Sequence, residues 1–242
     1  MTSRYAIYFC PEPETRLWQV ASAWLGRDAC TDYDTPPIKH LRLQQDDIDA
    51  AVAAPSRYGF HATLVAPFEL AEHHSEQHLC DALAGFCNSY SPFTTPLEVQ
   101  RLHHFLALAP VVPDPDLDML AESCLRAFDI FRAPLSSYDR VRRDTPDLNR
   151  RQRELLTRWG YPYVLDAFRF HMSLTGALPP DLLAPMQSEL RALFSDLLRT
   201  PVAIAGLTLV KQTDRDKPFK WVRQCSFTAD NVISRQSRSA HA

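Results

Sequence analysis

One short pattern occurs twice in this chain of 242 residues. Residues 60–64 read FHATL and residues 170–174 read FHMSL, so each copy has a histidine directly after a phenylalanine and two positions before a hydroxyl residue. The two histidines, His61 and His171, are 110 positions apart (171 minus 61). A fold that uses both copies in one site must bring two distant segments together. This requirement constrains the architecture more than composition does.

Each copy predicts a β-strand with two unlike faces, because alternate side chains of a strand share a face. In the first copy the histidine's face carries Arg57, Gly59, His61, Thr63 and Val65. In the second copy it carries Arg169, His171, Ser173 and Thr175. The other face of the second copy is apolar and consists of Phe168, Phe170, Met172 and Leu174. We therefore expect one face to pack into a core and the other to present imidazole and hydroxyl groups.

If the two strands meet across a cleft, two imidazoles and two hydroxyls converge on one small volume, with Arg169 nearby as an anion contact. Cleavage of a phosphodiester needs a base for the attacking oxygen, an acid for the leaving oxygen and donors for the non-bridging oxygens. Histidines can serve as both acid and base near neutral pH. The alternative is that each histidine is a hydrogen-bonded core residue. Repetition of the whole five-residue order favours a phosphate site that needs no metal.

Composition restricts the size of the core, the binding partners and the cellular compartment that we expect. A hydrophobic fraction of 45% in 242 residues is enough for one large core or two small lobes. A net charge of -3 gives no bulk attraction to nucleic acid or anionic lipid. No apolar run approaches a membrane span, and the N-terminus lacks the features of an export signal. The six cysteines form no CxxC pair. We expect a soluble cytoplasmic protein with reduced thiols and no membrane partner.

Strands and helices alternate along the chain. Apolar periodicity predicts strands at 4–9, 58–68, 97–111, 163–176, 202–212 and 220–229, and helices at 12–26, 48–55, 75–90, 116–131 and 181–199, with two polar helical pieces within 133–158. The chain has 6 glycines and no glycine-rich phosphate loop, which argues against a Rossmann or P-loop nucleotide fold. No linker separates the halves, so we predict a single domain over 1–233 followed by a flexible tail at 234–242.

The paired motifs resemble those of the two-histidine phosphoesterases. The stretches RYAIYF, YGFHATLVAPF, FRAPL, RWGYPYV and FRFHMSLTG are similar to the branch described as a phosphonate-metabolism protein, DUF1045. The resemblance implies a bilobal α+β fold in which two antiparallel sheets with outer helices surround a central cleft, related by a pseudo-twofold axis. It also implies metal-independent chemistry on cyclic phosphates or 2′-5′ linkages, with no cofactor.

Carried over by motif position, the resemblance implies a role for each residue of the two motifs. His61 protonates the leaving oxygen and His171 activates water, while Thr63 and Ser173 hold phosphate oxygens. The acid and base can exchange with substrate orientation. Serine at 173 keeps the hydroxyl of the commoner threonine but loses its stiffness at χ1. If the substrate is a nucleotide, Tyr58, beside the first motif, and Phe219 could stack on its base or ring, and both could equally pack against a lobe.

Three functions remain open at this point. The first is an enzyme that hydrolyses the cyclic phosphate of a small sugar phosphate or nucleotide in phosphonate catabolism. The second is an RNA-end enzyme that opens 2′,3′-cyclic phosphates or processes 2′-5′ linkages. The third, from another class, is a non-catalytic module that binds a cyclic phosphate or nucleotide. The expected partners are accordingly a small cyclic phosphate or nucleotide, with RNA as the alternative.

Two further stretches carry charge or metal-binding residue types. The segment Arg140–Arg158 contains seven arginines, which could guide a polyanion to the cleft, but interleaved acids favour a solvated pair of helices. His74 and His78 are four apart, which suits one helix face, yet no third ligand accompanies them. The loop with Lys211, Arg215, Lys217 and Lys220 could hold a terminal phosphate or form an ordinary charged turn.

Overall fold

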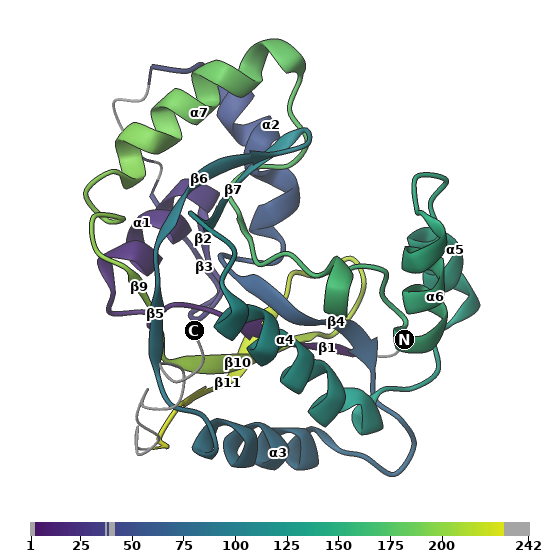
Figure 1. The fold of residues 1–242 in the computed structure, drawn as a ribbon. Helices are drawn as coiled ribbons and strands as arrows, with labels where there is room; N and C mark the ends of the chain where they lie inside the picture. The colour runs from purple at the N-terminus through teal and green to yellow at the C-terminus, as the bar shows by residue number, and fades with distance from the viewer. Residues whose placement is uncertain (1–2, 37, 39–41, 230–242) are drawn as a thin grey trace, which may run out of the picture.

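An antiparallel sheet of seven strands runs through the computed structural model, which describes residues 3–36, 38 and 42–229 (Figure 1). The strand order is β11-β10-β1-β4-β8-β7-β6. The strands are β1 (Arg4–Phe9), β4 (Ala62–Glu69), β6 (Leu97–Leu102), β7 (Phe105–Pro110), β8 (Met172–Ser173), β10 (Gly206–Gln212) and β11 (Lys220–Ser226). Two short pairs lie outside it: β2 (Arg27–Asp28) with β3 (Tyr33–Asp34), and β5 (Phe93–Thr95) with β9 (Val202–Ile204).

The sheet consists of two parts that meet at β4 and β8. Four strands, β11-β10-β1-β4, form one part, and three, β8-β7-β6, form the other. A single residue pair, Ala62 with Met172, joins them. The expected α+β fold with antiparallel sheets and outer helices is confirmed. The structure adds that the two sheets are continuous at this pair, which lies inside the two repeated motifs.

Helices surround the sheet, and two of them stand apart. They are α1 (Arg16–Leu25), α2 (Gln45–Ser56), α3 (Glu76–Asn88), α4 (Pro115–Phe128), α5 (Ser137–Arg143), α6 (Arg150–Trp159) and α7 (Pro180–Phe194), with 3₁₀ turns η1 (Asp129–Phe131) and η2 (Leu165–Ala167). Helix α3 packs on β10 and β11, α4 on β4, and α7 on β6 and β7. Figure 1 shows α1, α2 and α7 gathered at one end of the molecule, while α5 and α6 project from the other side.

Local sequence signals set the helix ends. Thr15 caps α1 by accepting from the Trp18 amide, and Gly26 ends that helix in the left-handed conformation. Ser75 caps α3 by accepting from the His78 amide. Asn149 and Gln152 form a capping box at the start of α6. These caps satisfy amide groups that the first turn of each helix leaves without partners.

The first motif lies at the start of β4, and two bulges follow it. The register passes from the pair Tyr8–Thr63 to Ile7–Val65, so β4 carries one extra residue there, and a second extra residue follows before Phe68. A bulge shifts which side chains face which side. The expected placement of Val65 beside His61 is therefore wrong: Val65 is 1% exposed and belongs to the core.

The second motif departs from the expected long strand. Residues 163–171 include the turn η2 and Leu165 at a φ of 52°, and only Met172 and Ser173 pair as a strand. The predicted alternation nevertheless holds, since the apolar side chains are buried: Phe168, Phe170, Met172 and Leu174. An extended backbone alternates its side chains whether or not its amides join a ladder. The periodicity predicted burial correctly and strand pairing incorrectly.

The core is continuous across both parts of the sheet. Trp24 of α1 donates from Nε1 to the Leu174 carbonyl at 2.7 Å, which ties the N-terminal helix to the second motif. All six cysteines are free thiols, as expected, and all but Cys30 are buried. In the described ranges no helix is long and apolar enough to cross a membrane. The tail expected at 234–242 lies outside the described residues.

The turn before the first motif depends on Gly59. Its φ is 77°, and a Cβ at this position would collide with the Cβ of Ala29. The same residue's carbonyl lies 2.9 Å from Nδ1 of His61. The glycine therefore fixes the backbone from which the histidine is oriented.

Gly59→Ala is expected to lower the free energy of unfolding by about 2–5 kcal/mol, because the left-handed conformation and the collision both oppose a side chain. Gly85→Ala is the matched control. Gly85 is exposed on α3 with nothing within 4 Å of its Cβ position, so alanine should raise the free energy of unfolding by about 0.5–1 kcal/mol. Urea unfolding measures both. Equal effects of the two substitutions would contradict this account of the turn.

Candidate active site

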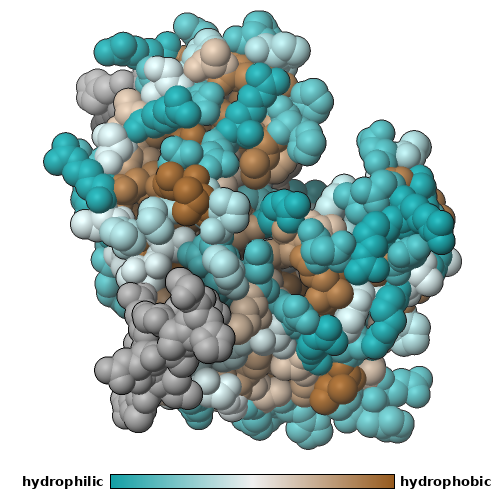
Figure 2. Space-filling view, viewed as in Figure 1, coloured by the Kyte–Doolittle hydropathy of each residue, from teal (hydrophilic) through white to brown (hydrophobic). Residues whose placement is uncertain are grey.

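Both motifs line one cavity of about 300 Å³. The surface is notched between the body of the protein and the projecting helices α5 and α6 (Figure 2). Five residues singled out from the sequence line the cavity together: Tyr58, His61, Thr63, His171 and Ser173. The remaining lining residues are Arg4, Tyr8, Ala66, Pro67, Asp139, Arg142, Arg143 and Tyr161.

Strand pairing explains why the two motifs meet. Ala62 and Met172 are direct partners in an antiparallel pair. In that register His61 lies opposite Ser173, and Thr63 lies opposite His171, all on the face away from the buried Ala62 and Met172. Side chains directly opposite each other on such a pair are about 5 Å apart at Cβ. Each histidine thus neighbours the hydroxyl of the other motif.

The two imidazoles are held in the same way. Nδ1 of His61 lies 2.9 Å from the Gly59 carbonyl, and Nδ1 of His171 lies 2.8 Å from the Arg169 carbonyl. A carbonyl oxygen can only accept, so Nδ1 carries the proton in each ring. Nε2 is then the basic nitrogen of the neutral ring. In His61 this atom is 3.1 Å from Oγ1 of Thr63.

Burial keeps both histidines neutral. It lowers the pKa of His61 to about 4; the Gly59 carbonyl opposes this shift and the charge of His171 adds to it. Burial also lowers the pKa of His171, against the raising effect of the Arg169 carbonyl. Both groups are proton acceptors at neutral pH. A bound anion would stabilise the imidazolium form of either ring.

An aromatic wall that the sequence did not reveal supports His61. Tyr8 of β1 stacks on the imidazole with ring centroids 3.8 Å apart. Its hydroxyl is buried and has no hydrogen-bond partner among the described residues. Burial raises the pKa of Tyr8 well above its usual value; Tyr58, Cys10 and Tyr161 add to the increase, and Arg4 opposes it. Tyr8 is one of the residues that line the cavity.

Phe219 does not line the cavity, so its ring is not available to stack on a ligand there. Its ring is fully buried and stacks on Tyr58 with centroids 5.4 Å apart. Tyr58 remains at the cavity with one face covered by this ring. The alternation of RYAIYF already placed Arg4 and Tyr8 on one face of β1, and this was the signal that could have identified both.

Arg169 lies outside the cavity. Its side chain is exposed, donates to the Asp166 carbonyl at 3.1 Å and borders a different groove, beside Phe170. The expected anion contact assumed that residues 169–173 form one regular strand, which they do not. Only the main-chain carbonyl of Arg169 serves the site, as the acceptor for His171.

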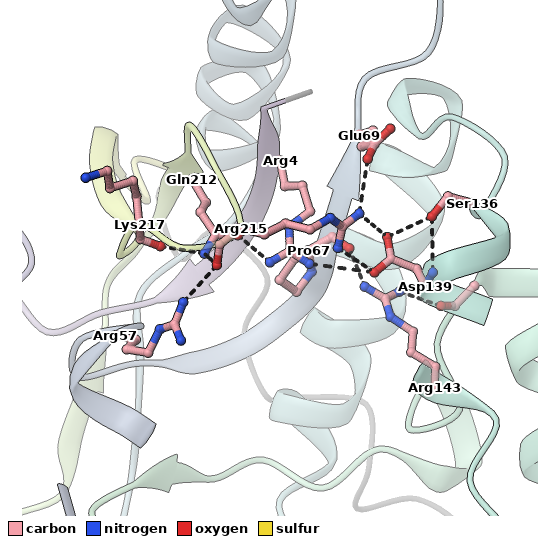
Figure 3. A network of polar contacts seen from close by, with 11 residues as sticks. Arg4, Arg57, Pro67, Glu69, Ser136, Asp139, Arg143, Gln212, Arg215 and Lys217 are labelled. Carbon is pink, nitrogen blue, oxygen red and sulfur yellow. Dashed lines mark hydrogen bonds and ion pairs between the residues drawn. The ribbon is translucent and has the colours of Figure 1, made fainter. Parts of the chain in front are cut away.

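Other arginines supply the positive charge. Figure 3 shows Arg4, Arg143 and Arg215 directed toward Asp139 of α5. Arg215 binds both carboxylate oxygens at 2.7 Å, and Arg4 lies 3.9 Å away. Burial raises the pKa of Asp139, but hydrogen bonds from Arg215 and the charges of the arginines outweigh it and lower the pKa below its usual value. Asp139 thus fastens α5 to the end of the sheet.

The arginine-rich segment divides in two. Arg142 and Arg143 of α5 line the cavity. The arginines of α6 pair with acids on the surface instead: Arg150 with Glu154, Arg151 with Asp166, Arg153 with Asp144 and Arg158 with Asp129. The expectation of a solvated helix fits α6 and fails for α5. From the sequence, the two helices look alike in charge.

The second histidine pair does not form a ligand set. His74 packs on Phe131 with centroids 4.6 Å apart, and its ring is 6.4 Å from that of His78. Across residues 3–36, 38 and 42–229, no group of three His, Cys, Asp or Glu side chains has metal-binding geometry. In the charged loop, Lys211 pairs with Glu76 at 2.7 Å, and Lys220 pairs with Asp32.

The fold and the cavity define an antiparallel α+β protein with two main-chain-anchored histidines at the junction of its sheets. The chain belongs to the family described as protein of unknown function DUF1045, whose model matches residues 63–220. This match confirms the resemblance that the motifs indicated.

Two curated relatives cover most of this chain. Both are named ribose 1,5-bisphosphate phosphokinase PhnN. The protein from Janthinobacterium sp. (strain Marseille) is 35% identical over 227 residues, which is 91% of this chain and 50% of the relative. The protein from Laribacter hongkongensis (strain HLHK9) is 36% identical over 220 residues, 91% of this chain and 51% of the relative. The chain spans about half the length of these relatives.

Solved structures match more loosely. A crystal structure of a phosphoesterase has a TM-score of 0.40 and 13% identity, covering 95% of this chain and 100% of that one. The crystal structure of E. coli LigT complexed with 3′-AMP has a TM-score of 0.40 and 14% identity, again covering 95% of this chain and 100% of that one.

Asp139→Ala is expected to lower the free energy of unfolding by about 3 kcal/mol, because it leaves Arg4 and Arg215 without their shared carboxylate. The pKa of Asp139 is lower in the folded than in the unfolded protein. Its contribution to the free energy of unfolding is therefore complete above the unfolded pKa of about 3.9 and is lost as the pH falls through the folded pKa. Urea unfolding at pH 7 and pH 3 measures both effects.

Asp144→Ala is the control for this substitution. Asp144 pairs with Arg153 in solvent, with side-chain exposures of 48% and 47%, so its loss should cost less than about 1 kcal/mol. Similar decreases in the free energy of unfolding of Asp139→Ala and Asp144→Ala would contradict the role assigned to Asp139.

Proposed function

We propose that the protein is a metal-independent phosphodiesterase that opens the cyclic phosphate of a small phosphorylated sugar. The observation that carries this proposal is the convergence of His61 and His171 on one cavity. Each ring is anchored at Nδ1 by a main-chain carbonyl, and each presents Nε2 as its basic atom. Two matched proton carriers at one phosphate site are what ring opening requires.

The reaction needs one proton removed and one supplied. His171 accepts a proton from water at Nε2 while the water oxygen bonds to phosphorus. The bond from phosphorus to one ring oxygen breaks, and protonated His61 supplies the proton that this oxygen takes up. The product is a phosphate monoester beside a free hydroxyl, and the two histidines have exchanged protonation states. If the cyclic phosphate binds in the opposite orientation, His61 acts as the base and His171 as the acid.

Hydroxyl donors stabilise the charge that develops on the phosphate. Thr63 and Ser173 lie beside the histidines on the same face, and Tyr8, whose hydroxyl has no partner among the described residues, lines the same cavity. Donors already in position lower the barrier without reorganisation during the reaction. Tyr8 also limits the motion of His61, because its ring covers one face of the imidazole.

The names of the relatives support a sugar phosphate as substrate. They describe a kinase that acts on ribose 1,5-bisphosphate. Hydrolysis of a 5-phosphorylated ribosyl 1,2-cyclic phosphate, with cleavage of the bond to O2, yields that bisphosphate. The proposed reaction would therefore supply the compound in the relatives' name. Kinase activity belongs to those proteins, which are about twice as long as this chain.

A nucleotide 2′,3′-cyclic phosphate, free or at an RNA end, is the second candidate. Tyr58 and Tyr161 border the cavity, and tyrosine rings can stack on nucleobases. A module that binds the same ligands without turnover is the alternative from another class.

Phosphorus NMR with a panel of ribosyl 1,2-cyclic phosphates and 2′,3′-cyclic nucleotides, with excess chelator present, tests the proposal. We expect ring opening by the wild type and a loss of at least about 100-fold in each of His61→Ala and His171→Ala, the range of general acid–base catalysis. Ligand binding by calorimetry should persist in both variants. Binding without turnover by the wild type would indicate the binding module, and loss of turnover with chelator would refute the metal-free mechanism.

The pH dependence follows from the two lowered pKa values. One histidine must be protonated and the other neutral, so kcat/KM should be bell-shaped, with limbs near pH 4 and below 6.5. The shape is the same whichever residue is the acid. Ribose 1,2-cyclic phosphate suits this measurement, because a phosphate monoester would add its own titration near about pH 6. A rate that stays constant from pH 7 to 9 would contradict the assignment.

A further inference from the structure

The cavity carries more positive charge than one phosphodiester requires. Three arginines line it, Arg4, Arg142 and Arg143, against one carboxylate, Asp139. That carboxylate is already bound through both oxygens by Arg215, a fourth guanidinium. Burial lowers the pKa of Arg4 and of Arg143; neighbouring arginines add to this shift, and Asp139 opposes it. Arg215 also pairs with Glu69 at 3.2 Å, so these four arginines have two carboxylate partners, and two positive charges are left without one.

Two of these arginines have guanidinium groups that the described residues engage only in part or not at all. Arg142 is exposed and makes no hydrogen bond or ion pair with residues in the described ranges. Arg4 uses Nε and Nη2 on the Gln212 side chain, and its Nη1 is 3.9 Å from Asp139. Arg143 is different, because it donates to the Gly160 and Pro67 carbonyls and so holds the wall together.

The charged end is separate from the histidines. Tyr8 stacks on His61. Arg4 lies four residues earlier on β1, and in the strand register its backbone is opposite Glu69, at the far end of β4. Four residues of a strand span about 13 Å. Arg4, Arg142 and the two histidines nevertheless line one cavity of about 300 Å³.

We infer that Arg4 and Arg142 form a second phosphate subsite, which selects substrates bearing a phosphate monoester in addition to the cyclic phosphate. This inference rests on the proposed function, since it defines the substrate class of the same cavity. Tyr8, which stacks on His61, lines the cavity together with Arg4 and Arg142. A doubly charged monoester supplies the counter-charge that the arginines lack.

The size of the cavity favours a sugar over an oligonucleotide. Its volume of about 300 Å³ is at the lower end of the range for small-molecule pockets. A phosphorylated pentose places two phosphates within such a volume. In an RNA end, the second phosphate would be the next backbone diester and would carry a nucleoside with it.

The test compares ribose 1,2-cyclic phosphate with and without a 5-phosphate in three proteins: wild type, Arg142→Gln and Arg140→Gln. Arg140 is the matched control, because it is exposed on the same helix and does not line the cavity. We expect the wild type to prefer the phosphorylated substrate in kcat/KM. Arg142→Gln should reduce that preference about 10- to 100-fold, as expected for one charge-assisted hydrogen bond, and Arg140→Gln should leave it unchanged.

Calorimetry of ribose 5-phosphate binding to the same three proteins separates this inference from the proposed function. Weaker binding by Arg142→Gln alone supports the subsite even if no cyclic phosphate is opened, an outcome that would refute only the proposed function. Equal kcat/KM of the wild type for the two substrates overturns the subsite and leaves the phosphodiesterase intact. A dinucleotide with a 2′,3′-cyclic end that is preferred to the phosphorylated sugar also overturns it, as does absence of ribose 5-phosphate binding.

Discussion

The pairing of Ala62 with Met172 is the constraint on which the site depends. It is the only residue pair between β4 and β8 in the described sheet, and it joins the two parts of that sheet. Because the pair is antiparallel, it sets each histidine opposite the hydroxyl of the other motif. The repetition in the sequence thus becomes a local twofold arrangement. Both partners are almost completely buried. Packing on the apolar face of these strands therefore holds the histidines and hydroxyls of the opposite face in position.

A second set of contacts shapes the other end of the cavity. Helix α5 is short, and its only buried side chain is that of Asp139. It nevertheless forms a wall, because Asp139 is bound by Arg215 and because Arg143 donates to the Pro67 and Gly160 carbonyls. A buried carboxylate among arginines is costly to desolvate and is stable only while those arginines remain. The wall that completes the cavity is therefore held by charge, whereas the histidine end is held by apolar packing.

The sequence predicted the parts of the site that repeat and missed the parts that do not. His61, Thr63, His171 and Ser173 followed from the duplicated pattern. Alternation puts Tyr8 and Arg4 on one face of β1, but it does not place that face beside the histidines. Which strand lies beside β4 depends on topology, and β1 pairs with both β4 and the distant β10. Bulges in β4 and the unpaired stretch before β8 do not alter hydrophobic alternation, so periodicity could not report them. The arginines of α5 and α6 differ only in where each helix packs, which the sequence does not report: Arg142 and Arg143 of α5 line the cavity, and those of α6 do not.

The position of β1 between β4 and β10 affects how the protein comes to be folded. One of its neighbours is encoded about 60 residues later and the other more than 200 residues later, as the pairs Tyr5 with Phe68 and Arg4 with Gln212 show. Contacts between residues so far apart in sequence slow folding, because long loops must close before the contacts form. During synthesis one edge of β1 therefore stays unpaired until Gly206–Gln212 has left the ribosome. The strand that supports His61 is therefore made long before the second of its two neighbours, and its pairing is completed only when that neighbour is available.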